Sequence, residues 1–333
     1  MDLSQKPFCL LFTITQDLDQ DRECGLARAQ HMVQCLSQAI LAEHKDKVNG
    51  HQGTVPLIQR QVESSCWKLD DLGVAEQVYL CTGSHPKDSS VIGYVNPKAR
   101  NLSLDDVLTP SRLPHIVSDE SLLVLSPHQL QLLMIFQTVY LPPPCPSCRQ
   151  VKSEDVVGVV GSSHSAILCL RNLLESKLAP RVVNLYRSPL LYAVHLPDGR
   201  IMHDNTGLKG IAAEWARERL EAGVFEQAGR RERICIKDSP ETASEALDRC
   251  TAVVHAVGFS RNPLPVIIRE DGSPLTKVVH DTKSGQIAGA EGIKGFGIAF
   301  PETVVDPSGL NSLNIGLWDF MRHIREQLTT SMN

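Results

Sequence analysis

The stretch from Asp155 to Leu168 constrains the fold of this chain more than any other part of its 333 residues. It begins with an uncharged, valine-rich run, passes through Gly161, Ser162 and Ser163, and continues with an apolar pattern of helical period. This order predicts a buried parallel strand that turns tightly into a helix. The first-turn amides of such a helix have no intrahelical partner and lie at the positive end of its dipole. The turn therefore suits a phosphate or another oxyanion.

The glycine spacing of this turn matches the dinucleotide-binding fingerprint only in part. That fingerprint places glycine at three positions, with alanine allowed at the third. Here the three positions hold Gly161, Ser163 and Ala166. The middle position, where the backbone approaches a pyrophosphate, carries a side chain. Two interpretations stay open: the turn binds a dinucleotide through Gly161, Ser162, Ser163 and Ala166, or it keeps only the fold of such a site.

Composition and charge exclude several classes of protein. An apolar content of 42% and a charged content of 21% are typical of an ordinary soluble globular protein, and the length suffices for two modest domains. The net charge of −5 gives no reason to expect nucleic acid or an anionic membrane as partner. Ten scattered cysteines without a recognisable signal peptide indicate reduced thiols and a cytoplasmic location. We expect a small-molecule substrate, no nucleic acid and no membrane, with the oligomeric state left open.

Hydrophobic periodicity predicts the elements that surround the central turn. A helix over 26–43 carries an apolar stripe made of Leu26, Ala29, Val33, Leu36 and Ile40. Strands are expected over 55–62, 65–69 and 74–80, and a short helix over 104–108. After the turn, the pattern gives a helix over 164–177 and a strand over 181–187. A later helix, ending near Gly223, has a stripe expected to be buried and made of Leu208, Ile211, Ala212 and Trp215.

One basic residue bears on the choice of nucleotide. Arg187 ends the strand that follows the central helix. In a dinucleotide-binding fold an acidic residue there holds the ribose of NAD, whereas a basic one suits the 2′-phosphate of NADP. Arg187 therefore favours NADP if a dinucleotide binds. The alternative is an exposed arginine at a strand end.

Three further segments carry a resemblance to a known family. Two apolar strands end in glycine turns, Cys81-Thr82-Gly83-Ser84 and Ala256-Val257-Gly258-Phe259, and the chain closes with Gly297-Ile298-Ala299-Phe300-Pro301-Glu302. The first two resemble the Ala-Thr-Gly-type crossovers between the domains of flavoproteins with two dinucleotide folds. Together with the central turn and Thr206-Gly207-Leu208-Lys209-Gly210, their order resembles the fungal type of the FAD-dependent pyridine nucleotide-disulfide oxidoreductase-like family. The resemblance covers roughly 55–120 and 151–327.

This resemblance implies a fold and a division into domains. The fold class is α/β, a Rossmann-like three-layer sandwich with two dinucleotide-binding-type domains, of which the FAD-type domain is incomplete. The expected parts are a degenerate FAD-type domain over 1–115 and 264–333, an insertion over 116–150, and an NAD(P)-type Rossmann domain over 151–263. It also assigns Gly83, Gly258 and Pro301 to cofactor binding. The Cys145/Cys148 pair in the insertion lacks two further zinc ligands at suitable spacing, so no metal site is predicted.

One departure from the family shapes the expectation about cofactors. The family begins with a strand and a Gly-x-Gly-x-x-Gly turn, and the glycines before Cys81 do not make one: they are Gly25, Gly50, Gly53 and Gly73. Relative to the family, the chain is expected to be truncated at its N-terminus and to lack the amides that neutralise the FAD phosphates. We therefore expect no cofactor, or NADP if any, with FAD bound weakly or not at all.

Three functional hypotheses follow. The first is a cofactor-independent cyclase, isomerase or pericyclase, such as a Diels-Alderase, acting on an apolar secondary metabolite. It would orient the substrate and polarise a carbonyl with donors from His164, Ser165, Tyr192 and Lys209. The structural alternatives are a helix cap for His164 and plain solvent exposure for Tyr192 and Lys209. The second hypothesis is an oxidoreductase dependent on NADPH and FAD, and the third is a non-catalytic protein that binds a partner.

Overall fold

The computed structural model describes residues 26–62, 64–87, 96–110, 155–176 and 181–332. The insertion predicted over 116–150, with Cys145 and Cys148, therefore lies outside the described residues. The chain divides into two compact units. The smaller one comprises Met1–Val78, Leu264–Val279 and Ala288–Gly292, and the larger one Tyr79–Pro263, His280–Ile287 and Ile293–Asn333. The domain boundaries expected from the sequence stay a prediction.

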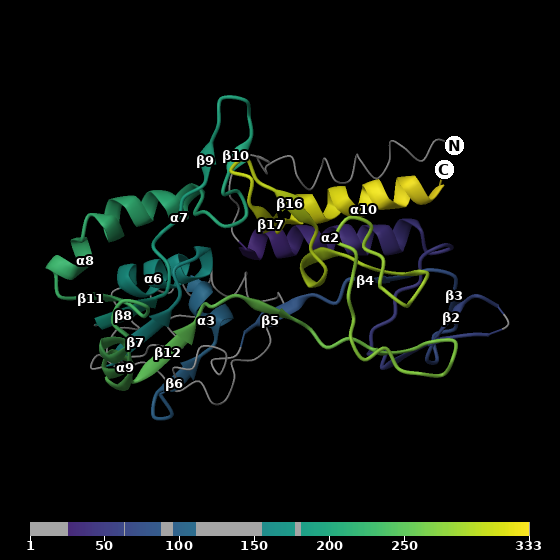
Figure 1. Cartoon of the computed structure of the whole chain (residues 1–333), viewed down its shortest axis with the longest axis horizontal. Coiled ribbons are helices and arrows are strands. Elements are labelled where there is room, and N and C mark those ends of the chain that lie inside the picture. The colour runs from purple at the N-terminus through teal and green to yellow at the C-terminus, as the bar shows by residue number, and fades with distance from the viewer. Residues whose placement is uncertain (1–25, 63, 88–95, 111–154, 177–180, 333) are drawn as a thin grey trace, which may run out of the picture. The chain divides into compact units, whose positions relative to one another are not determined.

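A five-stranded parallel sheet organises the larger unit (Figure 1). Its order is β11 (Arg231–Cys235), β8 (Arg181–Tyr186), β7 (Val156–Val160), β12 (Ala252–His255) and β6 (Arg100–Leu102). Every neighbouring pair runs parallel. The chain proceeds outward from β7 through β8 to β11 and then returns to β12 on the opposite side of β7. The strand order thus reverses between β7 and β12, which is where open α/β sheets bind ligands.

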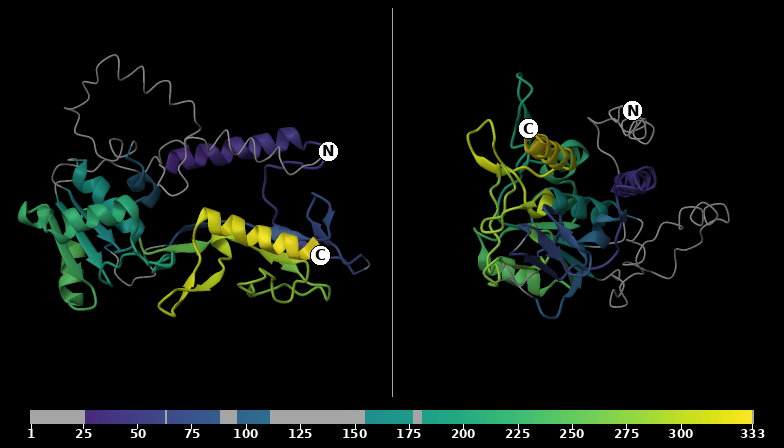
Figure 2. Two further views of the ribbon diagram at one scale, coloured as in Figure 1. Left: turned by 90° about the horizontal axis from the view of Figure 1, so that it is seen from above. Right: turned by 90° about the vertical axis from the view of Figure 1, so that its right-hand side faces the viewer.

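Helices cover both faces of this sheet, as the views in Figures 1 and 2 show. One face packs against α3 (Leu104–Leu108), α6 (His164–Glu175), α7 (Gly210–Trp215), η3 (Ala216–Glu221) and α8 (Val224–Gln227), and the other against α9 (Pro240–Asp248). Alternate strand residues serve the two faces: Val157 and Val159 belong to the first core and Val160 to the second. The predicted α/β class and three-layer Rossmann architecture are confirmed.

The smaller unit contains the long helix α2 (Leu26–Glu43) and a four-stranded sheet. The sheet order is β14 (Val266–Ile268), β1 (Leu57–Arg60), β2 (Trp67–Leu69) and β3 (Val74–Ala75). Strand β1 pairs with β14 in parallel and with β2 antiparallel. Trp67 anchors this unit, because its ring is 1% exposed and its Nε1 donates to the Glu291 carbonyl at 2.9 Å.

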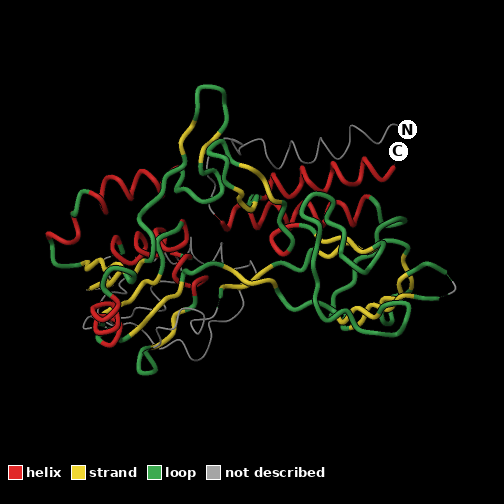
Figure 3. Tube along the Cα trace, viewed as in Figure 1, coloured by secondary structure: helices red, strands yellow, loops and turns green. Residues whose placement is uncertain are grey.

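Short strands and loops make up most of the rest, as the green and yellow segments of Figure 3 show. They are β4 (Val78–Leu80), β5 (Ser84–Pro86), β9 (Val194–His195), β10 (Ile201–Met202), β13 (Phe259–Arg261), β15 (Ile293–Gly295), η4 (Gly297–Ala299), β16 (Thr303–Val305) and β17 (Asn311–Leu313). Helix α10 (Leu317–Met332) follows. No described helix is long and apolar enough to cross a membrane. The cytoplasmic location stays a prediction.

Two local predictions were wrong, and the bounds of one helix are confirmed. The strand expected over 74–80 is two strands, because β3 pairs with β2 whereas the Val78 amide donates to the Gly292 carbonyl. Helix α2 has the predicted bounds, but Val33 and Ile40 of its apolar stripe are 42% and 40% exposed. Ile211 is 46% exposed because the buried face of its helix runs through Ala212, Trp215 and Ala216, one position away.

Candidate functional site

The central turn follows β7, at the point where the strand order of the sheet reverses between β7 and β12. Strand β7 ends at Val160, and α6 begins at His164. Between them Gly161 has a φ of +135°, and an added Cβ would lie 2.4 Å from the Ala256 carbonyl oxygen. Its amide donates to the Leu185 carbonyl at 2.8 Å. Only glycine fits this conformation and this close approach between neighbouring strands.

The start of α6 is open to a ligand. Ser163 precedes the helix with extended backbone, and its side chain makes no capping hydrogen bond. Ser163 and His164 are exposed, Ser162 and Ser165 are partly exposed, and Ala166 is fully buried. The Ala166 Cβ would lie 3.2 Å from a Cβ on Gly161, so the first turn of α6 also leaves little room for a side chain there. The predicted turn can therefore present first-turn amides to an oxyanion.

Asn184 holds this turn in place, and the sequence analysis missed it. The side chain is 2% exposed, and its Nδ2 donates to the carbonyls of Val159 and Gly161, at 3.2 and 2.9 Å. Both acceptors lie at the end of β7, where the strand ladder stops. The available signal was a polar amide in the middle of the apolar run 181–186.

Arg187 lies at the same edge of the sheet. It is exposed and directly follows Tyr186, the last residue of β8. The guanidinium of Arg233, from β11, lies 4.2 Å from the centre of the Tyr186 ring. Arg233 thus belongs to β11, and Arg187 directly follows the neighbouring strand β8 at its carboxyl end, where a nucleotide ribose is bound in this fold.

Tyr192 and Lys209 come from a different segment from His164 and Ser165. Tyr192 forms an isolated parallel bridge with Leu208, so the two predicted donors Tyr192 and Lys209 are brought close in the fold. The Tyr192 hydroxyl is buried, and the Glu221 carboxylate interacts with it. Burial, with help from the Glu221 carboxylate, raises the pKa of Tyr192 to about 12. Lys209 forms an ion pair with Asp204. The catalytic roles of these four residues stay a prediction.

The two predicted crossovers pair with each other. Strands β5 and β13 run antiparallel, with Ser84 opposite Arg261. Gly83 and Gly258 flank the pair with φ values of +72° and +101°. Asn262 ties the connections together, because its Nδ2 donates to the Thr82 carbonyl at 2.8 Å and its amide donates to the Gly83 carbonyl at 3.1 Å. The sequence placed Gly83 and Gly258 far apart, and the structure brings them to the two ends of one ribbon.

The closing segment lies beside the end of β4. Strand β15 pairs with β4, and the amide of Phe296 donates to the Leu80 carbonyl at 3.0 Å. Phe300 is fully buried, and the next residue is Pro301, whose carbonyl lies 3.2 Å from Nε2 of His280. Thus Gly83 and Pro301, both predicted to bind cofactor, follow two neighbouring strands.

An orphaned hydroxyl at this point fits a bound flavin. The Thr82 Oγ1 atom is buried and has no hydrogen-bond partner in the described part of the chain. A buried hydroxyl left unpaired costs about 1–3 kcal/mol, so a polar ligand group at this place has a physical reason to bind. Within the same described residues, no cluster of three or more His, Cys, Asp or Glu side chains could hold a metal ion.

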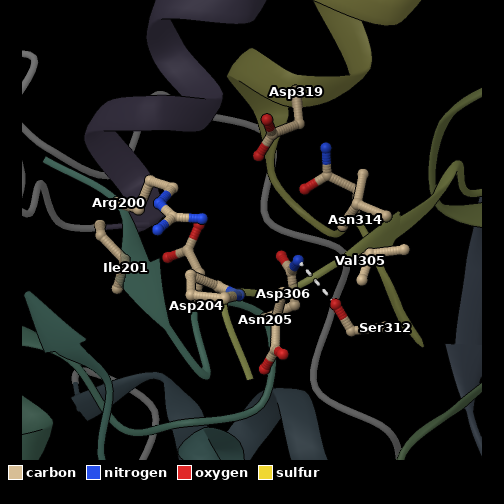
Figure 4. A pocket seen from close by; sticks show the side chains of 11 residues that line it. Arg200, Ile201, Asp204, Asn205, Val305, Asp306, Ser312, Asn314 and Asp319 are labelled. Carbon is tan, nitrogen blue, oxygen red and sulfur yellow. Dashed lines mark hydrogen bonds between the residues drawn. The ribbon is translucent and has the colours of Figure 1, made fainter. Parts of the chain in front are cut away.

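A small polar cavity lies elsewhere in the larger unit (Figure 4). Its volume is about 270 Å³, and its lining includes Arg200, Asp204, Asp306, Asn314 and Asp319. Figure 4 shows side chains from the β9–β10 and β16–β17 hairpins around it, with Asn205 donating to Ser312. Ligand pockets usually span roughly 300–1,000 Å³ and are mostly apolar, so this cavity is not a candidate cofactor site.

Comparisons with known proteins agree with this architecture. The chain is 36% identical over 339 residues to "Monooxygenase AgnR1" from Paecilomyces divaricatus, an alignment that covers 94% of this chain and 76% of AgnR1. Its fold is similar to the crystal structure of OTEMO in an FAD-bound form, with a TM-score of 0.51 at 10% identity, covering 98% of this chain and 87% of OTEMO. No protein-family model matches the sequence.

These findings correct the expectation about cofactors. The prediction of no cofactor, or of NADP without FAD, is wrong: the relative is a monooxygenase, and the protein of similar fold was crystallised with FAD bound. The reason is that one glycine spacing is only a common way to build a phosphate cradle, and other runs of backbone amides serve as well. The cyclase, isomerase and Diels-Alderase hypothesis finds no support, and the oxidoreductase alternative is favoured.

Proposed function

Because the chain belongs to the same family as monooxygenase AgnR1, we propose that it is an FAD-dependent monooxygenase that draws its electrons from NADPH. One observation carries the proposal beyond family membership. The turn after β7 lies at the reversal point of a parallel sheet, with Gly161 packed on the Ala256 carbonyl and the first turn of α6 open. That is the place where dinucleotides bind in this class of fold.

NADPH is the dinucleotide we assign to this turn. The amides at Ser162–Ser165 would receive the pyrophosphate at the N-terminus of α6. Arg187 would face the 2′-phosphate from the end of β8, where an acidic residue would instead select NADH. Asn184 would keep the turn rigid through its hydrogen bonds to Val159 and Gly161.

FAD is assigned to the edge formed by β4 and β15. A polar atom of the flavin would give the buried Thr82 hydroxyl a hydrogen-bond partner. Gly83 and Pro301 would border the cofactor. Bound FAD would supply the two-electron redox chemistry that couples the oxidation of NADPH to O₂. In the balanced reaction one oxygen atom enters the substrate and the other leaves as water, while NADPH and one proton yield NADP⁺. The chain itself binds and orients both cofactors.

The test is the nucleotide preference of matched arginine variants. The full chain with added FAD should oxidise NADPH faster than NADH. Arg187→Ala should raise the KM for NADPH about tenfold or more and change that for NADH little, because a hydrogen bond to a charged group is worth about 1.5–3 kcal/mol. Arg181→Ala is the control, since Arg181 is an exposed arginine at the opposite end of β8. The proposal fails if the chain oxidises neither nucleotide, or if both variants behave alike.

A further inference from the structure

One arginine of the crossover ribbon is held in place without a carboxylate partner. Arg261 ends β13 and is half-buried. Its Nε donates to the Ala299 carbonyl at 2.7 Å, and its guanidinium carbon lies 4.0 Å from the centre of the Phe300 ring. A backbone carbonyl and a ring face thus fix the guanidinium, while its two Nη groups take no part in either contact. Among the described residues, no carboxylate pairs with it.

This arrangement is unusual for a charged group with reduced access to water. Buried or half-buried arginines normally pair with a carboxylate or another anion, because desolvating an uncompensated charge is unfavourable. Burial lowers the pKa of Arg261. The free Nη groups form the planar fork that recognises phosphate and carboxylate with two parallel hydrogen bonds.

The surroundings of Arg261 indicate which anion it would meet. Ser84 lies opposite it in the β5–β13 pair, next to Gly83. Gly258 lies three residues before it, and Pro301 follows the Phe300 ring on which its guanidinium is stacked. Two of the residues expected to bind cofactor, Gly83 and Pro301, thus adjoin residues that face or contact Arg261, whereas Gly258 lies at the other end of the β5–β13 pair.

We propose that Arg261 binds a phosphate group of a bound dinucleotide at the junction of the two crossovers and the closing segment. The identity of the dinucleotide, FAD or NADPH, rests on the proposed function, whereas the phosphate site itself does not. In this role Arg261 binds and positions a cofactor. The stacked ring and the Ala299 carbonyl hold the fork ready, so little side-chain entropy is lost on binding.

Dissociation constants measured on the full chain test this assignment. The ligands are FAD, NADPH and inorganic pyrophosphate, each titrated separately by calorimetry. Arg261→Gln should weaken the binding of pyrophosphate and of one dinucleotide at least tenfold and leave the other dinucleotide within twofold, which identifies the source of the phosphate. Arg261→Lys should recover part of the affinity. Arg217→Gln is the matched control, because Arg217 also stacks on a ring, that of Tyr192 at 4.2 Å.

The outcomes separate this inference from the proposed function. If neither dinucleotide binds the wild-type chain but pyrophosphate binds and Arg261→Gln abolishes it, the monooxygenase proposal fails and the phosphate site stands. Unchanged constants in a folded Arg261→Gln chain would overturn the phosphate site, as would an equal loss in Arg217→Gln. Should the glutamine variant fail to fold, the lysine variant decides. The inference predicts a partial loss of pyrophosphate affinity in Arg261→Lys, and unchanged affinity of that variant for all three ligands would overturn it.

Discussion

At the scale of single residues, Gly161 carries two separate requirements. Its φ of +135° disfavours any side chain, and its Cα faces the Ala256 carbonyl at a distance that leaves no room for one. We expect Gly161→Ala to destabilise the chain by about 2–4 kcal/mol, since backbone strain and steric overlap add. Gly229 is the matched control, because it also has a positive φ, +66°, but open space around it.

Denaturant unfolding of the two alanine variants separates the requirements. Gly229→Ala should cost only the conformational part, about 1 kcal/mol. If Gly161→Ala were no more costly than Gly229→Ala, the close approach of β7 and β12 would not be what fixes glycine at the turn.

The raised pKa of Tyr192 predicts that the stability of the chain falls at high pH. Its pKa is raised from 10.0 to about 12 in the folded chain, so the protonated phenol is the form that folding favours. Its stabilising contribution is complete below about pH 10 and is lost as the pH rises toward about 12. Tyr192→Phe should therefore gain stability relative to wild type as the pH is raised from 9 to 11.

The same variant has an internal control at neutral pH. The Tyr192 hydroxyl is buried and interacts with the Glu221 carboxylate, so its removal should lower the free energy of unfolding by about 0.5–1.5 kcal/mol. A much larger loss of unfolding free energy at neutral pH would mean that the hydroxyl holds the fold through further contacts. A difference between the two proteins that does not vary with pH would contradict the raised pKa.

At the scale of elements, one buried arginine joins three of them. The Arg231 side chain, from β11, is 1% exposed. Its Nε donates to Glu226 of α8 at 2.6 Å, and its Nη2 to the Leu220 carbonyl of η3 at 3.1 Å. Glu226 is 34% exposed and stays accessible to water without its partner, so the loss is that of hydrogen bonds to a charged group, about 1.5–3 kcal/mol. We expect Arg231→Ala to destabilise the larger unit by about that amount.

Arg249 supplies the comparison for this prediction. It pairs with Glu232 at 3.0 Å, but its side chain is 56% exposed. Exposed pairs contribute about 0–1 kcal/mol, so thermal unfolding should show a small shift for Arg249→Ala and a large one for Arg231→Ala. Similar shifts in the two variants would show that burial of the Arg231 pair is not what holds η3 and α8 to the sheet.

The elements also show what sequence patterns could predict. The β7–turn–α6 unit could be predicted from local sequence, because a charge-free valine run followed by a helical period is typical of a buried strand that leads into a helix. The break between β3 and β4 was missed, since it depends on which distant strand each half pairs with. Asn184 and Arg261 were missed for a related reason: their partners lie in other segments of the chain.

At the scale of the whole molecule, fold class was predictable and cofactor was not. Alternating strands and helices specify a Rossmann-like layer structure whichever cofactor is bound. The cofactor site that we propose draws on groups from several segments, namely Thr82, Gly83, Arg261 and Pro301. A search for one contiguous glycine motif cannot detect a site assembled in this way.

The most direct test of the account is a titration of the purified full chain with FAD, followed by flavin fluorescence and by equilibrium dialysis. We expect saturation at one FAD per chain, with a dissociation constant in the micromolar range or below. We also expect the bound flavin to be reduced when NADPH is added without oxygen. Absence of saturable FAD binding by a folded chain would contradict it.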